Sequence, residues 1–261
     1  MKYLLIEPKS RAIDPNIALM KFARWCELNN HQYQYVRGIV KPDISADIGL
    51  MSCLFSYDSQ LYEKTIDHYL RYVDLIRVGG VFPSLSPDWF KKSKWLAWGG
   101  VFDFKDRIKV HQGLCSDIDN LIPKYNINIK SEDTLYPCHN IVLYASRGCV
   151  NNCGYCAVPK LEGPMKPAKS IRDILETARQ ELPRAKGVVL YDNNFTEHAH
   201  FDHIVNELID FGLPIDIHGL HVESFTRAKA KLLSHLNWNG QGEQATPYIR
   251  FSFDKMKYFP H

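Results

Sequence analysis

Three cysteines lie close together in the segment Ser146-Arg147-Gly148-Cys149-Val150-Asn151-Asn152-Cys153-Gly154-Tyr155-Cys156. Their spacing, C-x3-C-x2-C, lets one loop surround a compact metal centre, and the two glycines allow the tight backbone that such wrapping requires. Thiolate ligands favour iron–sulfur clusters, zinc and copper(I). Four thiolates saturate a cubane iron–sulfur cluster, whereas three leave one iron open, as a catalytic metal needs. Structural zinc is the weaker interpretation, because it uses four ligands and no second C-x2-C pair lies nearby.

The motif resembles the signature of the radical S-adenosylmethionine enzymes, in which an aromatic residue, here Tyr155, precedes the last cysteine. The resemblance implies that Cys149, Cys153 and Cys156 hold three irons of a [4Fe–4S] cluster whose fourth iron chelates S-adenosylmethionine. Tyr155 would contact the cofactor. Reduction by a donor such as flavodoxin or ferredoxin would then yield a 5′-deoxyadenosyl radical for hydrogen abstraction or cobalamin-assisted methyl transfer on an unknown substrate.

Polar residues that follow later strands extend the resemblance. It implies that Asp192, Asn193 and Asn194 contact the methionine amino group, although an Asx turn that caps the next helix is the alternative. Ser252 and Asp254, near the fourth strand, are the candidates for contact with the ribose.

Histidines gather in the same part of the chain. His218, His221 and Glu223 can reach a cofactor or substrate, or equally be solvated loop residues. A second metal site at His198-x-His200 is conceivable, but exposure of the histidines near a helix start is the simpler interpretation.

Alternating strands and helices must position these residues. Apolar periodicity predicts strands at 141–145, 187–191, 215–218 and 248–253, and helices at 171–181, 203–211 and 226–236. The polar clusters fall at strand carboxyl ends, where α/β barrels put their active sites. We therefore expect a partial radical S-adenosylmethionine (β/α) barrel over residues 141–261, ending after its fourth strand. A fragment of a longer enzyme, a short form completed by a second copy or a partner chain, and an unusually small sheet remain open.

The preceding residues predict another α/β domain, with strands at 3–6, 31–37, 48–55 and 75–78 and helices at 17–28 and 62–72. Residues 1–125 resemble the Rossmann-like, cobalamin-binding type of domain, on the segments Ser52-Cys53-Leu54 and Val78-Gly79-Gly80-Val81-Phe82-Pro83-Ser84-Leu85-Ser86-Pro87. The loop Glu7–Asp14 lacks the histidine of the cobalt-ligating motif, so cobalamin would bind without it or the domain is an empty relic. Residues 126–140 are expected to form an irregular connector.

Composition restricts the class of protein. The chain has 261 residues, 45% hydrophobic and 23% charged, which suits two globular domains. Its 32 basic and 29 acidic residues leave a net charge of +3, which does not indicate nucleic-acid binding. No apolar stretch predicts a membrane span, so a soluble cytoplasmic protein with reduced cysteines is expected. The rival function is a non-catalytic iron–sulfur or zinc-binding subunit.

Overall fold

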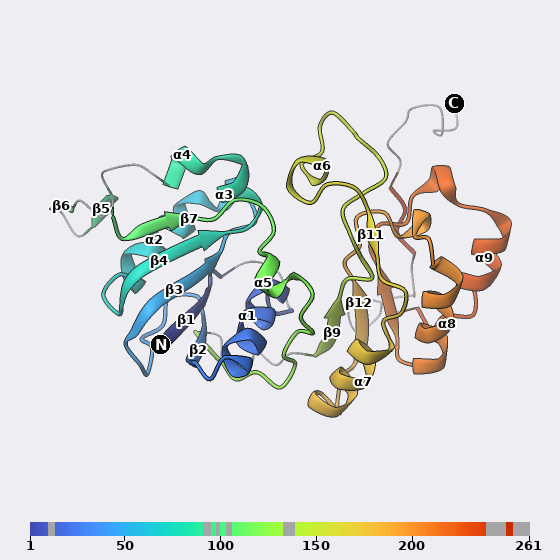
Figure 1. Cartoon of the computed structure of the whole chain (residues 1–261), viewed down its shortest axis with the longest axis horizontal. Helices are drawn as coiled ribbons and strands as arrows, with labels where there is room; N and C mark the ends of the chain where they lie inside the picture. The colour runs from blue at the N-terminus through green and yellow to red at the C-terminus, as the bar shows by residue number, and fades with distance from the viewer. Residues whose placement is uncertain are drawn as a thin grey trace. The chain divides into compact units, whose positions relative to one another are not determined.

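The chain folds into two compact units, Met1–Cys138 and His139–His261, each with its own parallel sheet. The computed structural model describes residues 1–9, 14–90, 95–97, 100–102, 106–132, 139–238 and 249–252. Strands and helices alternate in both units (Figure 1), which confirms the expected α/β class. Within the described residues, every helix is too short or too polar to cross a bilayer.

A six-stranded parallel sheet forms the centre of the first unit, in the order β7-β4-β3-β1-β2-β8. Its strands are β1 (Lys2–Glu7), β2 (Gln32–Arg37), β3 (Ala46–Ser52), β4 (Val73–Gly79), β7 (Ile108–Val110) and β8 (Ile129–Ser131). From β1 the chain moves to β2 and then returns past β1 to β3 and β4, so the winding direction reverses at β1. In parallel α/β sheets such a reversal marks the usual ligand crevice, at the carboxyl ends of the two adjacent strands.

The other elements of this unit lie in the connections between these strands. They are α1 (Ile17–Leu28), the 3-10 turn η1 (Ser56–Asp58), α2 (Ser59–Tyr69), α3 (Val81–Leu85), α4 (Pro87–Phe90), the antiparallel pair β5 (Trp95–Ala97) and β6 (Gly100–Phe102), and α5 (Ser116–Asp119). The bounds of α1 match the predicted helix. Asn16 begins it, because its side-chain oxygen accepts the backbone N–H groups of Ala18 and Leu19.

The prediction that residues 126–140 form an irregular connector is wrong in part. Ile129–Ser131 forms the edge strand β8, which pairs in parallel with β2, and Asn140 begins the first strand of the second unit. The polar Lys130 and the shortness of β8 concealed this strand, because an edge strand with half-buried side chains lacks a strong apolar signal.

The second unit contains a three-stranded parallel sheet in the order β13-β12-β9. Its strands are β9 (Asn140–Leu143), β12 (Gly187–Leu190) and β13 (Ile215–Ile217). The other elements are β10 (Ser146–Arg147), α6 (Val158–Leu161), β11 (Lys166–Pro167), α7 (Arg172–Glu181), η2 (Phe195–Glu197), α8 (Phe201–Phe211), η3 (Val222–Ser224) and α9 (Arg227–Leu233).

Each crossover in this sheet moves in the same direction, so the usual right-handed connections place α7 and α8 on one face. Figure 1 draws α8 and α9 on the same side of β9 and β12. The side chains that alternate onto one face are all fully buried, namely Ile141, Leu143, Val188, Leu190, Ile215 and Ile217.

The strand predicted at 248–253 is a second error. Of these residues, 249–252 are described, and they make only an isolated parallel bridge between Ser252 and His221. The fourth position in the sheet is instead entered at Trp238, which bridges Ile215 in parallel, and Asn237 accepts the N–H of Ile215. The aromatic residues of 248–253 favoured the prediction of a strand there. Which residues pair with β13 depends instead on where the chain returns to the sheet after α9.

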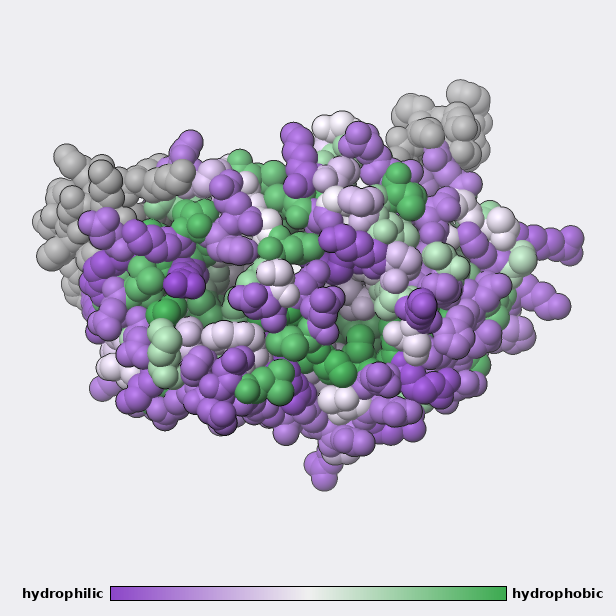
Figure 2. Space-filling model, viewed as in Figure 1, coloured by the Kyte–Doolittle hydropathy of each residue, from purple (hydrophilic) through white to green (hydrophobic). Residues whose placement is uncertain are grey.

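Polar side chains cover much of the face seen in Figure 2, with hydrophobic side chains in separate groups. One polar group acts inside the second unit. Glu207 on α8 is buried and accepts hydrogen bonds from the Ser170 hydroxyl at 2.5 Å and the Ile171 N–H at 2.8 Å. A carboxylate at the start of α7 complements the helix dipole, so α7 and α8 are joined where the first βα connection ends.

Candidate functional site

The cysteine loop leaves the carboxyl end of β9 and is closed at its base. Arg147 and Ser146 of β10 pair antiparallel with Lys166 and Pro167 of β11, so residues 148–165 form one loop that contains α6 (Figure 1). This loop comes before α7 and therefore occupies the first βα connection of the second unit. Its position agrees with the strand–loop–helix order expected for residues 141–181.

Gly148, directly before the first cysteine, is constrained by its backbone conformation and by hydrogen bonds to both of its peptide groups. Its φ is +80°, and a Cβ there would lie 2.3 Å from the carbonyl oxygen of Pro164, so only glycine fits. Its N–H donates to Glu162 at 2.8 Å, and its carbonyl accepts from Asn193 at 3.4 Å. Glu162 also pairs with Arg147 at 3.1 Å. These contacts fix where the chain enters the cysteine segment.

The three cysteines are half-buried and carry free thiols. The Asn151 N–H donates to Cys149 Sγ at 3.3 Å, and the Cys156 N–H donates to the Cys153 carbonyl at 3.0 Å. Among the described residues, no three His, Cys, Asp or Glu side chains are grouped closely enough to hold a metal ion. The donor types and the N–H bond to sulfur suit an iron–sulfur cluster. Ligation would require the three side chains to turn toward one another.

Tyr155 lies between these cysteines and is 76% exposed. Its side chain therefore reaches outward from the loop. The contact with cofactor implied for Tyr155 stays a prediction.

Asp192 connects the ends of two strands. It follows β12, is 3% exposed, and accepts the Ala145 N–H at 2.8 Å and the Ser146 hydroxyl. Burial raises the pKa of this carboxyl to about 6, although the hydrogen bonds from Ser146 and Ala145 oppose the rise. The carboxyl thus joins β12 to the residues that lead into the cysteine loop, whereas sequence reasoning assigned it to the methionine amino group.

The two asparagines after Asp192 have different surroundings. Asn193 donates to Glu162 at 3.0 Å and so contacts the base of the loop. Asn194 is 1% exposed, and its carbonyl oxygen accepts the Thr196 hydroxyl at 3.3 Å, while its amide nitrogen has no hydrogen-bond partner among the described residues. A buried amide without a partner is uncommon in folded proteins, and such groups often mark functional positions.

Gly219 brings the end of β13 against this segment. Its φ is +78°, and a Cβ there would lie 2.3 Å from the Asp192 carbonyl oxygen. The Phe195 N–H donates to the Gly219 carbonyl at 2.7 Å, and the His221 N–H donates to the Thr196 hydroxyl at 2.7 Å. The ends of β12 and β13 are therefore packed backbone to backbone.

Ser252 reaches the same edge, beside the end of β13. Its N–H donates to the Leu220 carbonyl at 2.9 Å, and its hydroxyl donates to the same oxygen at 3.2 Å. Of the two residues expected to contact the ribose, the structure thus brings Ser252 next to His221. Asp254 lies outside the described residues.

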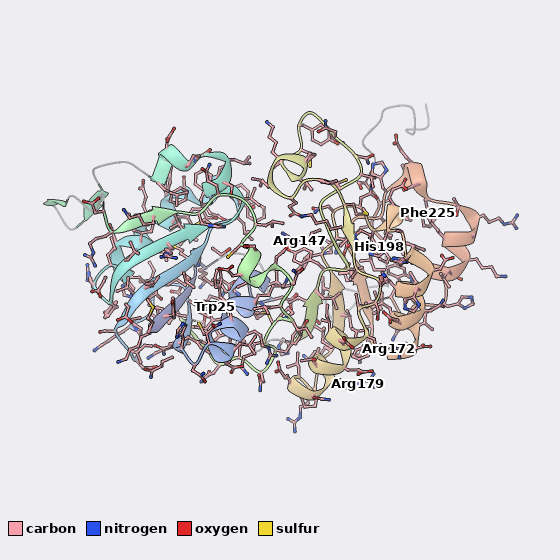
Figure 3. The ribbon with its side chains drawn as sticks, viewed as in Figure 1. Trp25, Arg147, Arg172, Arg179, His198 and Phe225 are labelled. Atoms are coloured by element: carbon pink, nitrogen blue, oxygen red, sulfur yellow. The ribbon has the colours of Figure 1, made fainter. Side chains whose placement is uncertain are left out.

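His198, named with His200 as a conceivable metal site, lies in the interior of the second unit, whereas His203 at the helix start is exposed, as expected. His198 is 4% exposed; its Nε2 lies 3.0 Å from the Ala145 carbonyl oxygen, and its Nδ1 accepts the His200 N–H at 3.0 Å. Burial lowers the pKa of this imidazole, and nearby His200 adds to the effect, while the Ala145 hydrogen bond opposes it. With both nitrogens engaged, His198 has a structural role in this arrangement (Figure 3).

Sequence reasoning named His218 but missed Tyr144 and Tyr191, which form a row of rings with it across the sheet. Tyr144, Tyr191 and His218 each follow directly after a strand, and the register of β9, β12 and β13 makes them neighbours. Ring centroids are 6.4 Å apart between the two tyrosines and 4.8 Å apart between Tyr191 and His218. By strand alternation they project from the face opposite the fully buried one. Their identical offset from each strand end is the signal that could have found them.

Charged groups lie at both ends of this row. The Arg147 guanidinium lies 4.3 Å from the Tyr144 ring centroid. At the other end, Arg250 Nη2 is 2.5 Å from each Asp216 carboxylate oxygen and 2.7 Å from His218 Nε2. Burial alone would raise the pKa of Asp216, but hydrogen bonds and charge from His218 and Arg250 lower it overall. The row is therefore bounded by paired charges.

The carboxyl edge of the first sheet was predicted to suit cobalamin. A Cβ on Gly80 would lie 2.4 Å from the Cys53 carbonyl oxygen, so contact between the ends of β3 and β4 explains that glycine. Apolar side chains are exposed around this contact: Leu54 38%, Phe55 48%, Val81 40% and Leu85 48%. These residues suit apolar contact with a flat ligand, and the loop after β1 contains no histidine to bind cobalt.

Comparison of the chain with protein-family models gives no match, and neither does comparison with curated proteins.

Proposed function

We propose that this chain is a radical S-adenosylmethionine enzyme whose second unit is a partial (β/α) barrel. The observation that carries the proposal is the C-x3-C-x2-C loop, which leaves the carboxyl end of the first parallel strand and has Gly148 fixed at its start. Cys149, Cys153 and Cys156 would be the ligands of a [4Fe–4S] cluster. When bound with S-adenosylmethionine, the cluster supplies one-electron cleavage of the sulfonium to a 5′-deoxyadenosyl radical.

The arrangement of the second sheet supports a barrel-like architecture. Its strand order follows the chain order, and one face is fully buried. A sheet that winds in a single direction curves toward closure, as in α/β barrels, and the opposite face then becomes the interior. Tyr144, Tyr191 and His218 belong to that opposite face. We propose that these rings line the substrate and cofactor space and exclude water from it.

The deciding experiment is cleavage of S-adenosylmethionine. The protein is reconstituted anaerobically with iron and sulfide, reduced with dithionite or a flavodoxin system, and assayed for 5′-deoxyadenosine by mass spectrometry. We expect formation of 5′-deoxyadenosine that is lost in Cys149→Ala, Cys153→Ala and Cys156→Ala. A fully reconstituted wild type that makes none would reject the enzyme proposal and favour the non-catalytic iron–sulfur subunit. Stoichiometric zinc without sulfide would reject the cluster as well.

Cobalamin-assisted methyl transfer is a second candidate, favoured by the exposed apolar side chains at the ends of β3 and β4. They lie beside the winding reversal at β1, where sheets of this type bind ligands. Incubation with hydroxocobalamin followed by gel filtration tests it. We expect retention of the corrin by the wild type and its loss in a Phe55→Ser, Val81→Ser double variant. A wild type that elutes without corrin would leave hydrogen abstraction as the reaction class.

A further inference from the structure

We propose that Asp192 and His198 act together as positioning residues for the cysteine loop by holding the single residue Ala145. The effect on cluster binding rests on the proposed function, whereas the contacts at Ala145 do not. Ala145 is 1% exposed and lies between the end of β9 and the start of β10. Both of its backbone polar groups are bound by side chains from the connection between β12 and α8, and its carbonyl also accepts the backbone N–H of Ala168 at 2.8 Å.

The two contacts have opposite polarity and complement each other. The Ala145 N–H donates to Asp192 Oδ2 at 2.8 Å. Because His198 Nδ1 accepts the His200 N–H, the imidazole proton belongs on Nε2, which then donates to the Ala145 carbonyl at 3.0 Å. A neutral imidazole is needed for this pattern, and burial favours it. The peptide groups on either side of Ala145 are thus held in one orientation.

The residues that follow continue the same pattern up to the first cysteine. The Ser146 hydroxyl donates to Asp192 Oδ1, and the Gly148 carbonyl accepts from Asn193. Glu162, on the far side of the loop, binds Arg147 and the Gly148 N–H. Every residue from Ala145 to Gly148 is therefore bound by a side chain of the connection between β12 and α8 or by Glu162.

This arrangement gives the β12–α8 connection control over the direction in which Cys149 leaves the sheet. Metal ligation requires ligand distances within about 0.2 Å, so a small rotation at Ala145 would misplace the first thiolate. Groups that orient ligands from behind typically change metal affinity about 10- to 100-fold when removed. Asp192 and His198 differ from such groups only in acting through the backbone.

Paired substitutions separate positioning from general stability. In His198→Asn the side chain can still accept the His200 N–H but is too short to reach the Ala145 carbonyl. In His198→Gln the amide nitrogen occupies the place of Nε2 and can donate. Likewise, Asp192→Asn keeps an acceptor for the Ala145 N–H, and Asp192→Ala removes it. His203→Gln is the matched control, because His203 lies on α8, is 58% exposed and contacts Glu207.

Two measurements decide the proposal. Hydrogen exchange of the peptide that contains Ala145, in protein without metal, should be at least about 10-fold faster in His198→Asn and Asp192→Ala, and close to wild type in the other three variants. Iron loss to a chelator after reconstitution should be about 10-fold faster in the same two variants. Thermal denaturation identifies variants that fail to fold.

The outcomes are distinguishable from failure of the proposed function. If the wild type takes up no iron and sulfide, the proposed function fails, and the exchange measurement alone still decides whether Ala145 is held as described. Wild-type exchange and iron retention in folded His198→Asn would overturn the positioning role. Equal defects in His198→Gln and His198→Asn would overturn it too, because the donated hydrogen bond would then be irrelevant.

Discussion

Glu7 and Asp192 are buried carboxylates at the carboxyl ends of parallel strands, one in each unit, and their partners differ. Glu7 ends β1 and is bound by the Arg37 guanidinium at 3.3 Å, the Tyr35 hydroxyl and the Asn16 N–H. Asp192 follows β12, and its hydrogen-bond donors, the Ala145 N–H and the Ser146 hydroxyl, are neutral. Burial raises the pKa of both carboxyls.

This difference distinguishes a carboxylate that joins packed elements from one that holds the start of a loop. The Glu7 cluster joins β1, β2 and the start of α1, so it stabilises elements that are already packed together. The Asp192 contacts instead hold the beginning of a loop that carries three thiols outward. The buried carboxylate with a charged partner thus joins β1, β2 and α1, whereas the one with backbone and hydroxyl partners holds the entry to the cysteine loop.

The largest expected effect concerns the cysteines of the two units. Replacing Cys149, Cys153 and Cys156 together by Ala should abolish iron and sulfide uptake, because no other thiol of the described residues lies on that loop. Cys115→Ala in the first unit should leave the iron content unchanged. Iron and sulfide analysis after anaerobic reconstitution measures both. Equal losses in the two proteins would remove the distinction between the units.

Breaking the charged pair of the first unit should cost most in stability. Glu7→Ala removes the carboxylate that pairs with the buried Arg37, and removing one partner of a buried ion pair typically costs about 3–5 kcal/mol. Asp43→Ala, which breaks the exposed pair with Lys130, should change the stability far less, because water and salt screen exposed ion pairs. Denaturant unfolding of both variants is the measurement. A Glu7→Ala protein as stable as Asp43→Ala would show that the cluster does not hold the sheet edge.

Titration of Asp192 should make the free energy of unfolding depend on pH. Because folding raises its pKa from 3.8 to about 6, the folded state binds the proton more tightly. The contribution of Asp192 is therefore fully present below about pH 4 and is lost as the pH rises through about 6, a change of about 3 kcal/mol.

Asp192→Asn should remove this component. Glu7 acts in the same direction in both proteins, so the difference between the wild type and Asp192→Asn, measured by denaturant unfolding from about pH 4 to 7, isolates Asp192. Parallel curves for the two proteins would contradict the raised pKa.

The smallest effect tests how Asp192 is held. Gly219→Ala introduces a Cβ that clashes with the Asp192 carbonyl oxygen, whereas Gly163 has a similar φ, +75°, and open space around its Cβ position. Gly163→Ala should cost about 1 kcal/mol from backbone strain alone. Gly219→Ala should cost clearly more and should also accelerate exchange at Ala145. Equal costs would mean that the β13 end does not support Asp192.

Local patterns in the sequence predicted most elements of the fold. The Asn16 cap and the apolar spacing after it define α1, and the buried runs at Leu4 and Val188 define central strands. The short edge strand β8 and the bridge at Trp238 escaped prediction, because their only signal is pairing with residues far away in the chain.

The candidate site, too, has residues that the sequence predicts and residues that it does not. The C-x3-C-x2-C spacing and the Asp192–Asn194 segment are visible in the sequence, and the structure brings Asp192 and Asn193 to the base of the cysteine loop. His198 is indicated by the sequence only as half of a conceivable metal site with His200. Its burial depends on the Ala145 carbonyl, which lies 53 residues earlier and has no side-chain identity to reveal it.

The sequence by itself determined which thiols could act as metal ligands and how they are spaced, because all three belong to one loop. Only the tertiary structure decided which groups serve that loop. Asp192 and His198 are bound to the backbone of Ala145, just after β9, and Tyr144, Tyr191 and His218 become neighbours through strand register. Such contacts depend on how distant strands align, and alignment is set by packing of the whole sheet.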